Sequence, residues 1–286
     1  MKNVELLKIY EGALTNTSNS YSKNTIRGYM KDVKEFVEAF DRSVLELDRY
    51  DIMEYMDSLN KIGSTYAKVL SGIKNFYSLL MLKRELNIVF NPCEGIKRPK
   101  VINKEKVPLT NEQVQAMYNG CKNKRDYAIL KLLLSNGLRI HELINLTLRQ
   151  YQKRDSNNKI ILTVTKGGKP RAIYLNDESV RAIDEYLKVR KNSEYDNLFI
   201  SNGGTPMLDS SLRRTWKSIA RNSNEFDDVD VKNMCNHLMR ATCATKLNDK
   251  GVKISVIQSV LGHSDISTTR RYVKDNEEDI IMAMNL

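Results

Sequence analysis

Two arginines stand in short segments whose residue types suit the binding of an anion. Arg139 follows Gly137-Leu138, a pair that would end a helix, and Arg240 lies three residues after His237 at the expected start of another helix. A spacing of three places His237 and Arg240 on one helix face, so both side chains could reach the same anion. A planar guanidinium group matches the geometry of a phosphate through parallel hydrogen bonds. The first hypothesis for these residues is therefore phosphate chemistry.

A third segment adds a histidine and a tyrosine. His263 follows Leu261-Gly262 and precedes Tyr272 by nine residues. Taken alone, Tyr272 is one of 14 tyrosines, most of which must be packing residues, and a single histidine is more often structural than catalytic. The order and spacing of the three segments argue for a shared site, in which two of the chain's three histidines, His237 and His263, would take part.

These segments resemble the three motif regions of the tyrosine recombinase (phage integrase) family. The family has a Gly-Leu-Arg-x-x-Glu-Leu box, a His-x-x-Arg box, and a Leu-Gly-His box followed by Thr-Thr and a nucleophilic tyrosine. All three occur here in the same order, over residues 137–143, 237–240 and 261–272. The family's β-hairpin lysine corresponds to Lys166, before the Gly167-Gly168 turn. The resemblance covers nearly the whole chain and is to the small two-domain type, which includes Xer-like recombinases and transposon resolvases or integrases.

The resemblance implies an enzyme that cuts and rejoins DNA strands at a specific site. Tyr272 would attack a phosphodiester to form a covalent 3′-phosphotyrosine, and paired exchanges through a Holliday junction would complete integration, excision or resolution. A phenol with a pKa of about 10 needs a base at neutral pH. The resemblance assigns that base to His237 and the protonation of the departing 5′-oxygen to Lys166.

Four further residues would act on the phosphate or support those that do. Charge grows on the non-bridging oxygens in the pentacovalent state, so Arg139 and Arg240 should clamp the phosphate and His263 should add a third hydrogen bond. Glu142, one turn after Arg139, resembles the family's supporting acid; the alternative is a simple surface charge. The phosphotyrosine conserves the energy of the ester, so resealing should need no ATP, and we expect no metal ion or other cofactor.

Two positions depart from the family's pattern. Ala241 stands where members often have a histidine, which we expect to tune activity without abolishing it, and His141 stands where many relatives have a small residue. Two other functions are also compatible with the motifs: a type IB topoisomerase and a DNA-binding accessory protein that is catalytically silent. The complete set of catalytic residues argues against the second. The apolar tail and small N-terminal bundle disfavour the first.

The composition favours a polyanionic partner. The 286 residues include 46 Lys and Arg against 35 Asp and Glu, a formal net charge of +11. No apolar run approaches the roughly 18 to 20 residues that span a bilayer, and the N-terminus lacks the apolar core of a signal peptide. We therefore expect a cytoplasmic protein, associated with the nucleoid when bound to DNA. The cysteines show no metal-ligand spacing, so we expect them to be reduced and mostly buried: Cys93, Cys121, Cys235 and Cys243.

Apolar periodicity predicts a helical bundle over residues 1–95, which the resemblance identifies as a core-binding, DNA-binding domain. Helical spacing recurs over residues 26–40, 52–59 and 66–80. On the last of these helices a polar face could contact DNA or simply be solvated: Lys68, Ser71, Lys74 and Asn75. The Gly-, Pro- and Lys-rich segment 96–106 reads as a linker.

Residues 107–286 are predicted to form the catalytic domain, with a tail helix at its C-terminal end. A capping box over 110–113 and an apolar run over 127–134 indicate helices, and β-branched runs at 160–165 and 172–175 indicate a hairpin. Further helices are expected at 178–190, 210–221, 238–248 and 254–261. The predicted fold is mainly α, with an N-terminal helical bundle and an α+β catalytic domain that contains a small antiparallel sheet.

The C-terminal residues 280–286 are too apolar to lie comfortably in water. They could fold back on their own domain, but the resemblance favours docking on a neighbouring protomer, with a dimer on each site and a tetramer in the synapse. The expected partner is double-stranded DNA with an inverted-repeat core site, enclosed by the two domains. We expect a chain of this length to lack room for an added arm-binding domain. This leaves Xer-like chromosome resolution, transposon cointegrate resolution, or integration and excision by a small mobile element, and we favour a mobile-element recombinase or a resolvase.

Overall fold

The computed structural model describes residues 2–16, 21–99, 107–165, 169–263, 265 and 269. The chain divides into two compact units, residues 1–104 and 105–286, and each has a hydrophobic core of its own. The division falls within the segment that the sequence indicates as a linker, of which 100–106 lie outside the described residues. The mainly helical fold with one small antiparallel sheet is confirmed. No helix of the described residues is long and apolar enough to cross a membrane.

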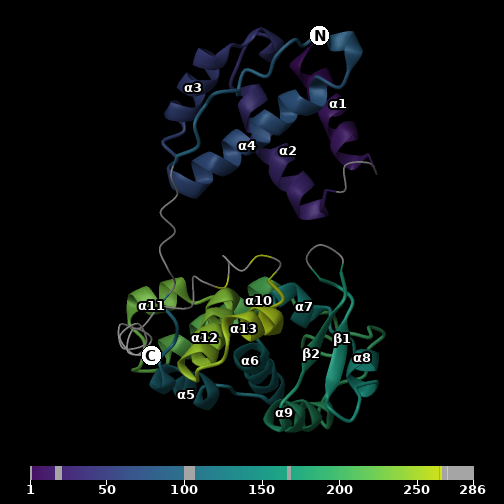
Figure 1. Ribbon diagram of the computed structural model, residues 1–286, viewed down its shortest axis with the longest axis vertical. Coiled ribbons are helices and arrows are strands. Elements are labelled where there is room, and N and C mark those ends of the chain that lie inside the picture. Colours follow the sequence, from purple (N-terminus) through teal and green to yellow (C-terminus); the bar gives the residue numbers. More distant parts are fainter. Residues whose placement is uncertain are drawn as a thin grey trace, which may run out of the picture. The chain divides into compact units, whose positions relative to one another are not determined.

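The first unit is a helical bundle, as predicted (Figure 1). Three of its helices match the apolar periodicity, and each buries the stripe that marked it. The elements are α1 (Asn3–Thr15), α2 (Lys23–Glu38), η2 (Val44–Glu46), α3 (Arg49–Ser58), α4 (Gly63–Leu80) and η3 (Arg84–Leu86). Helix α1 was not predicted. Only Leu6, Tyr10 and Leu14 are buried along it, a stripe too narrow to stand out, and its position depends on packing against α2 and α4.

In its described residues, the second unit carries ten helices and strands around α6 (Lys124–Asn136). They are α5 (Asn111–Asn119), α7 (Ile140–Ile144), α8 (Leu148–Gln152), β1 (Lys159–Leu162), β2 (Arg171–Tyr174), α9 (Asp177–Leu187), α10 (Asp209–Arg221), α11 (Asp228–Asn233), α12 (Asn236–Asp249) and α13 (Ile254–Leu261). Thr110 and Gln113 form the predicted capping box of α5. The short helices α7, α8 and α11 were not predicted, because five or six residues leave no measurable period.

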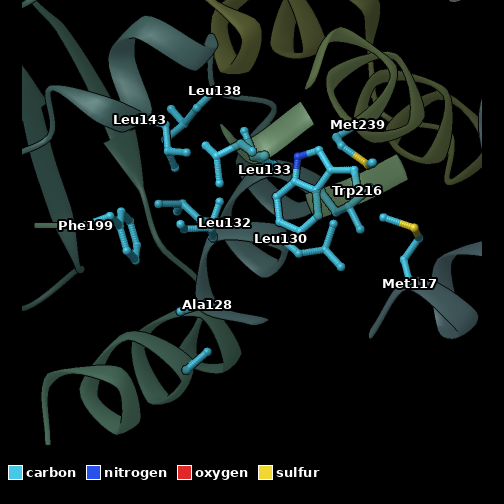
Figure 2. Packing of buried hydrophobic residues seen from close by; sticks show 14 of the residues in the cluster. Met117, Ala128, Leu130, Leu132, Leu133, Leu138, Leu143, Phe199, Trp216 and Met239 are labelled. Atoms are coloured by element: carbon cyan, nitrogen blue, oxygen red, sulfur yellow. The ribbon is translucent and has the colours of Figure 1, made fainter. Parts of the chain in front are cut away.

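Helix α6 is buried on most of its circumference and packs between α9 and α12 (Figure 1). Its Leu130 and Leu133 lie beside the indole of Trp216, with Met117 and Met239 on the other sides of the ring (Figure 2). The Trp216 ring is fully buried, and its Nε1–H donates to Asn236 Oδ1 at 2.6 Å. This core fixes the start of α12 against α10.

The two strands pair antiparallel, with Lys159 opposite Tyr174 and Leu162 opposite Arg171. Ile160 and Leu162 are buried while Ile161 is exposed, the alternation expected of a sheet with one face on the core. The predicted hairpin is therefore present, although its turn, residues 166–168, lies outside the described residues. The four cysteines are free thiols: Cys93 and Cys243 are buried, and Cys121 and Cys235 partly so.

Candidate active site

Gly137 ends α6 in the left-handed conformation (φ 55°), which glycine adopts without steric cost. A Cβ at this position would lie 2.5 Å from Leu261 Cδ2, so glycine also allows α13 to come close. The Gly137 carbonyl points to Arg240 and accepts a hydrogen bond from Nη1. The first glycine of the motif thus brings the end of α6 to the arginine of another motif.

Arg139 occupies the N-cap of α7, and the carboxylate of Glu142, three residues later, accepts from the backbone N–H of this N-cap. Its backbone N–H donates to Glu142 Oε2 at 2.8 Å and its Nη1 donates to Glu142 Oε1 at 3.0 Å. Its Nη2 donates to the Gly262 carbonyl at 2.6 Å. The side chain keeps 26% of its surface exposed while the carboxylate keeps 1%. The buried acid therefore holds the arginine, and the interpretation of Glu142 as a surface charge is wrong.

Arg171 is the residue that sequence reasoning missed. From β2 it chelates Glu142, with Nε 3.1 Å from Oε1 and Nη2 2.7 Å from Oε2. Burial alone would raise the pKa of Glu142, but the hydrogen bonds and charges of Arg171 and Arg139 outweigh burial and lower the pKa. Glu142 is therefore ionised at neutral pH. The only available signal was a basic residue inside a strand that follows the family's hairpin lysine.

Arg240 lies on α12 and is 2% exposed. Besides the Gly137 carbonyl, it binds the Leu261 carbonyl through Nη2 at 2.7 Å. His237 lies one turn earlier on the same helix, at an exposed position. The start of this helix is fixed by Asn236, which accepts from Trp216 and donates through Nδ2 to Asp209 Oδ1 at 2.6 Å.

His263 follows directly on Gly262, the left-handed C-cap of α13. Its Nδ1 lies 2.8 Å from Thr269 Oγ1. Burial, together with the positive charges of Arg240 and Arg139 and smaller effects from His237 and Arg171, lowers the pKa of His263 to about 4. The imidazole is therefore neutral at physiological pH and could donate a hydrogen bond without carrying charge.

Three arginines gather at the ends of α6 and α13: Arg139 and Arg171 share the carboxylate of Glu142, and Arg240 binds the carbonyls of Gly137 and Leu261. Guanidinium groups suit a phosphate diester, whose charge grows in a pentacovalent transition state. The structure thus brings Arg139, Glu142, Arg240 and His263 together, with His237 near them. Lys166 and Tyr272 lie outside the described residues, as does the tail, 280–286.

Comparison with known proteins agrees with this arrangement. Residues 108–279 match the model of the phage integrase family, and residues 14–84 match that of the phage integrase N-terminal SAM-like domain. The chain belongs to the phage integrase family. A tyrosine recombinase of Pseudothermotoga lettingae is 32% identical over 275 residues, 92% of each chain, and the tyrosine recombinase XerD of Halalkalibacterium halodurans is 29% identical over 269 residues, 88% of this chain and 87% of the relative.

Solved structures of integrases and recombinases share the fold of this phage integrase family member. The Tn1549 transposon integrase (residues 82–397) in complex with circular intermediate DNA superposes with a TM-score of 0.76 at 21% identity, covering 98% of both chains. The XerH recombinase bound to difH substrate also gives a TM-score of 0.76, at 17% identity over 98% of this chain and 96% of that chain. The recognised family, the fold class and the class of enzyme, a site-specific tyrosine recombinase, are confirmed.

The predicted DNA-facing residues of α4 have different surroundings in this recombinase. Lys74 is exposed, while Lys68 forms an ion pair of 2.9 Å with the buried Asp32. Ser71 is half-buried and donates to a carbonyl of its own helix. Asn75 is also half-buried, accepting from Tyr10 and donating to Tyr21 through hydroxyl contacts of 2.9 and 2.8 Å. Asn75 therefore holds helices together, and the role of all four residues in DNA contact stays a prediction.

Proposed function

We propose that this chain breaks and rejoins DNA strands with Tyr272 as nucleophile, through a covalent 3′-phosphotyrosine and a Holliday junction. The observation that carries the proposal is that Arg139 and Arg240 converge on the end of α13. Arg139 binds the Gly262 carbonyl and the buried Glu142, and Arg240 binds the Leu261 carbonyl. Guanidinium groups held in this way in a half-buried place favour an anionic ligand. Tyr272, the nucleophilic tyrosine of the family's third motif, follows Thr269, the last described residue, by three positions.

Arg139 and Arg240 act as the phosphate clamp in this proposal. Both guanidinium groups are held by backbone carbonyls of the α13 end, so their orientation is fixed before the substrate arrives. His263 adds a hydrogen bond from its neutral imidazole, and Glu142 supports Arg139. The roles of His237 as base and of Lys166 as acid rest on the family resemblance of their positions.

The partner in this proposal is double-stranded DNA with an inverted-repeat core site. The net charge of +11 supports this proposal. So do the similar solved structures, which are of an integrase and a recombinase bound to DNA. Residues 1–95 would bind the core site and 107–286 would carry catalysis, joined by a linker over 96–106. A dimer on each site and a tetramer in the synapse would be joined by the C-terminal tail. The protein would work in the cytoplasm, on the nucleoid.

Covalent trapping tests the proposal directly. The substrates are DNA duplexes taken from the genomic flanks of the coding region and selected because the protein binds them. Each duplex is nicked near the candidate crossover point, so that cleavage releases a short strand and cannot reverse. The wild-type chain should form a protein–DNA adduct on a denaturing gel, in EDTA and without ATP. Tyr272→Phe should form none, because it lacks the attacking oxygen.

Tyr174→Phe is the matched control, since Tyr174 is an exposed tyrosine of β2 and should leave the adduct unchanged. An adduct with Tyr272→Phe would show that the nucleophile is another residue. Relaxation of a supercoiled plasmid without any bound site would favour a type IB topoisomerase over a site-specific recombinase.

A further inference from the structure

Arg171 makes contacts that none of the motif residues can replace. We infer that Arg171 is a positioning residue for the phosphate clamp: it locks Glu142, and through it Arg139, while holding the end of α13 that carries His263. This inference rests on the proposed function, because it concerns the same reaction. Arg171 belongs to no motif box and stands on β2, five residues after Lys166 in the chain.

The first contact, with Glu142, completes the set of hydrogen bonds to a buried carboxylate. An ionised carboxylate offers about four acceptor positions, and Glu142 has four donors: the N–H and Nη1 of Arg139, and the Nε and Nη2 of Arg171. Without Arg171, a carboxylate that is 1% exposed would lose half of its hydrogen bonds and one of two counter-charges. It would then take up a proton, draw in water or move, and Arg139 would lose its fixed partner.

The second contact holds the end of α13. Arg171 Nη1 donates to the Val260 carbonyl at 2.8 Å. The next two carbonyls, of Leu261 and Gly262, accept from Arg240 and Arg139. Three successive carbonyls are thus held by three different arginines. The first of them sets the position of the two that orient the clamp, and cationic groups at this end also complement the helix dipole.

The stem of Arg171 is fitted to Gly262. A Cβ on Gly262 would lie 2.6 Å from Arg171 Cδ and 2.8 Å from its Nε. The left-handed conformation of Gly262 (φ 64°) and this close approach together require glycine next to His263. Lysine could not replace Arg171, because one ammonium group cannot chelate Glu142 and also reach the Val260 carbonyl.

These contacts separate Arg171 from a residue that binds the substrate. Its Nε, Nη1 and Nη2 all donate to protein groups, two of them to Glu142 and one to the Val260 carbonyl. An effect of Arg171 on the reaction must therefore pass through Arg139, Arg240 or His263, and the contact with Glu142 points first to Arg139. The rate difference between charged and uncharged linkages at the scissile position should therefore respond to Arg171, whereas a merely structural role would leave this difference unchanged.

The test compares charged and uncharged linkages at the scissile position. In a methylphosphonate, one non-bridging oxygen is a methyl group, so one negative charge and one contact for the clamp are removed. Each diastereomer removes a different oxygen. Arg171→Met should slow single-turnover adduct formation on the phosphodiester by about 10²-fold. On the diastereomer that lacks the oxygen bound by Arg139, the loss should shrink to less than about 10-fold.

Arg171→Lys keeps the positive charge but should show most of the same loss of cleavage rate on the phosphodiester, and the same smaller loss on the methylphosphonate. The affinity of both variants for the DNA site should change little. Arg190→Met is the matched control. Arg190 is half-buried in the same unit and donates to the carbonyls of Leu198 and Asn197, so its loss should weaken the fold without distinguishing the linkages. Circular dichroism checks folding, and if Arg171→Met does not fold, Arg171→Lys decides alone.

Equal losses on all linkages would overturn the inference, as would a phosphodiester rate within about 3-fold of wild type. Both outcomes presuppose that the wild-type chain forms the adduct. If the wild-type chain forms no adduct on any linkage, the proposed function fails before Arg171 is tested.

Discussion

Each guanidinium group of the site donates to a backbone carbonyl at the end of a helix, and this explains why arginine occupies all three positions. Arg139 donates to the carbonyl of Gly262, and Arg171 donates to that of Val260. Arg240 donates to the carbonyls of both Gly137 and Leu261. A guanidinium has five N–H donors in a rigid fork, so it can bind a carbonyl and keep a second direction for a carboxylate or a phosphate. A lysine ammonium in the same place would bind with far less directional control.

His263 should make the protein sensitive to acid. Its folded pKa of about 4 lies below the ordinary value of 6.5, so between these pH values the unfolded chain binds more protons than the folded one. The free energy of unfolding contributed by this group is therefore full above pH about 6.5 and falls with decreasing pH, by up to about 1.4 kcal/mol per pH unit. His263→Gln should lack this part of the dependence.

Urea unfolding of the wild type and of His263→Gln, measured between pH about 7 and about 5, checks this expectation. The two curves of unfolding free energy against pH should converge as the pH falls. Parallel curves would mean that folding does not lower the pKa of His263.

At the scale of elements, the site is assembled where two helices end. Helices α6 and α13 both terminate in a left-handed glycine, and the carbonyls of the two ends, at Gly137, Leu261 and Gly262, receive the two arginines proposed as the clamp. The N-terminal end of α12, which carries His237, is fixed to α10 by Asn236. The geometry of the site therefore depends on helix termini and only indirectly on loops.

Gly137→Ala should destabilise the second unit more than a strained backbone alone would. The added Cβ meets Leu261 Cδ2 at 2.5 Å in the core, so we expect a loss of about 2 to 4 kcal/mol. Gly251→Ala is the control, because Gly251 is also left-handed (φ 71°) but a Cβ there meets nothing within 4 Å. Its loss should be about 1 kcal/mol.

Urea unfolding free energies of the two glycine variants measure the difference. The adduct assay should also show slower cleavage for Gly137→Ala, because α13 carries the carbonyls that orient Arg139 and Arg240. Equal losses of stability for the two variants would mean that α6 and α13 can separate at no cost.

At the scale of the whole molecule, two cores of different construction serve one chain. The first unit is rich in edge-to-face aromatic contacts, with Phe36 meeting Phe40, Tyr55, Phe76 and Tyr77. The second is built of aliphatic side chains around α6 and Trp216 (Figure 2). Each core is large enough to support cooperative unfolding of its own unit.

Ile73→Ala and Leu133→Ala test the independence of the two cores. Both side chains are fully buried, in α4 and α6 respectively, so each truncation should cost about 2 to 5 kcal/mol. Differential scanning calorimetry should show each variant lowering the transition of its own unit and leaving the other unchanged. A single transition that shifts equally in both variants would contradict two separate folding units.

Local sequence patterns predict the types of most elements and five of the residues that the structure gathers at the ends of α6, α12 and α13. Helices α2, α3, α4, α9, α10 and α13 are visible because an apolar stripe repeats within one helix, and the capping box of α5 because its two partners lie three residues apart. Five residues of the site are visible because each lies in a short motif with the spacing of the family's boxes: Arg139, Glu142, His237, Arg240 and His263. Such signals are local.

Which of these residues touch, and which groups support them, follows from the packing of distant segments. Arg171 meets Glu142 across 29 positions and Val260 across 89, and no periodicity or turn connects them. Asn75 had the polar character of a surface residue, yet α1 and Tyr21 enclose its amide. The reason is physical: a hydrogen bond between distant segments depends on how whole helices pack, and packing is settled by the summed burial of many side chains, which no single segment encodes.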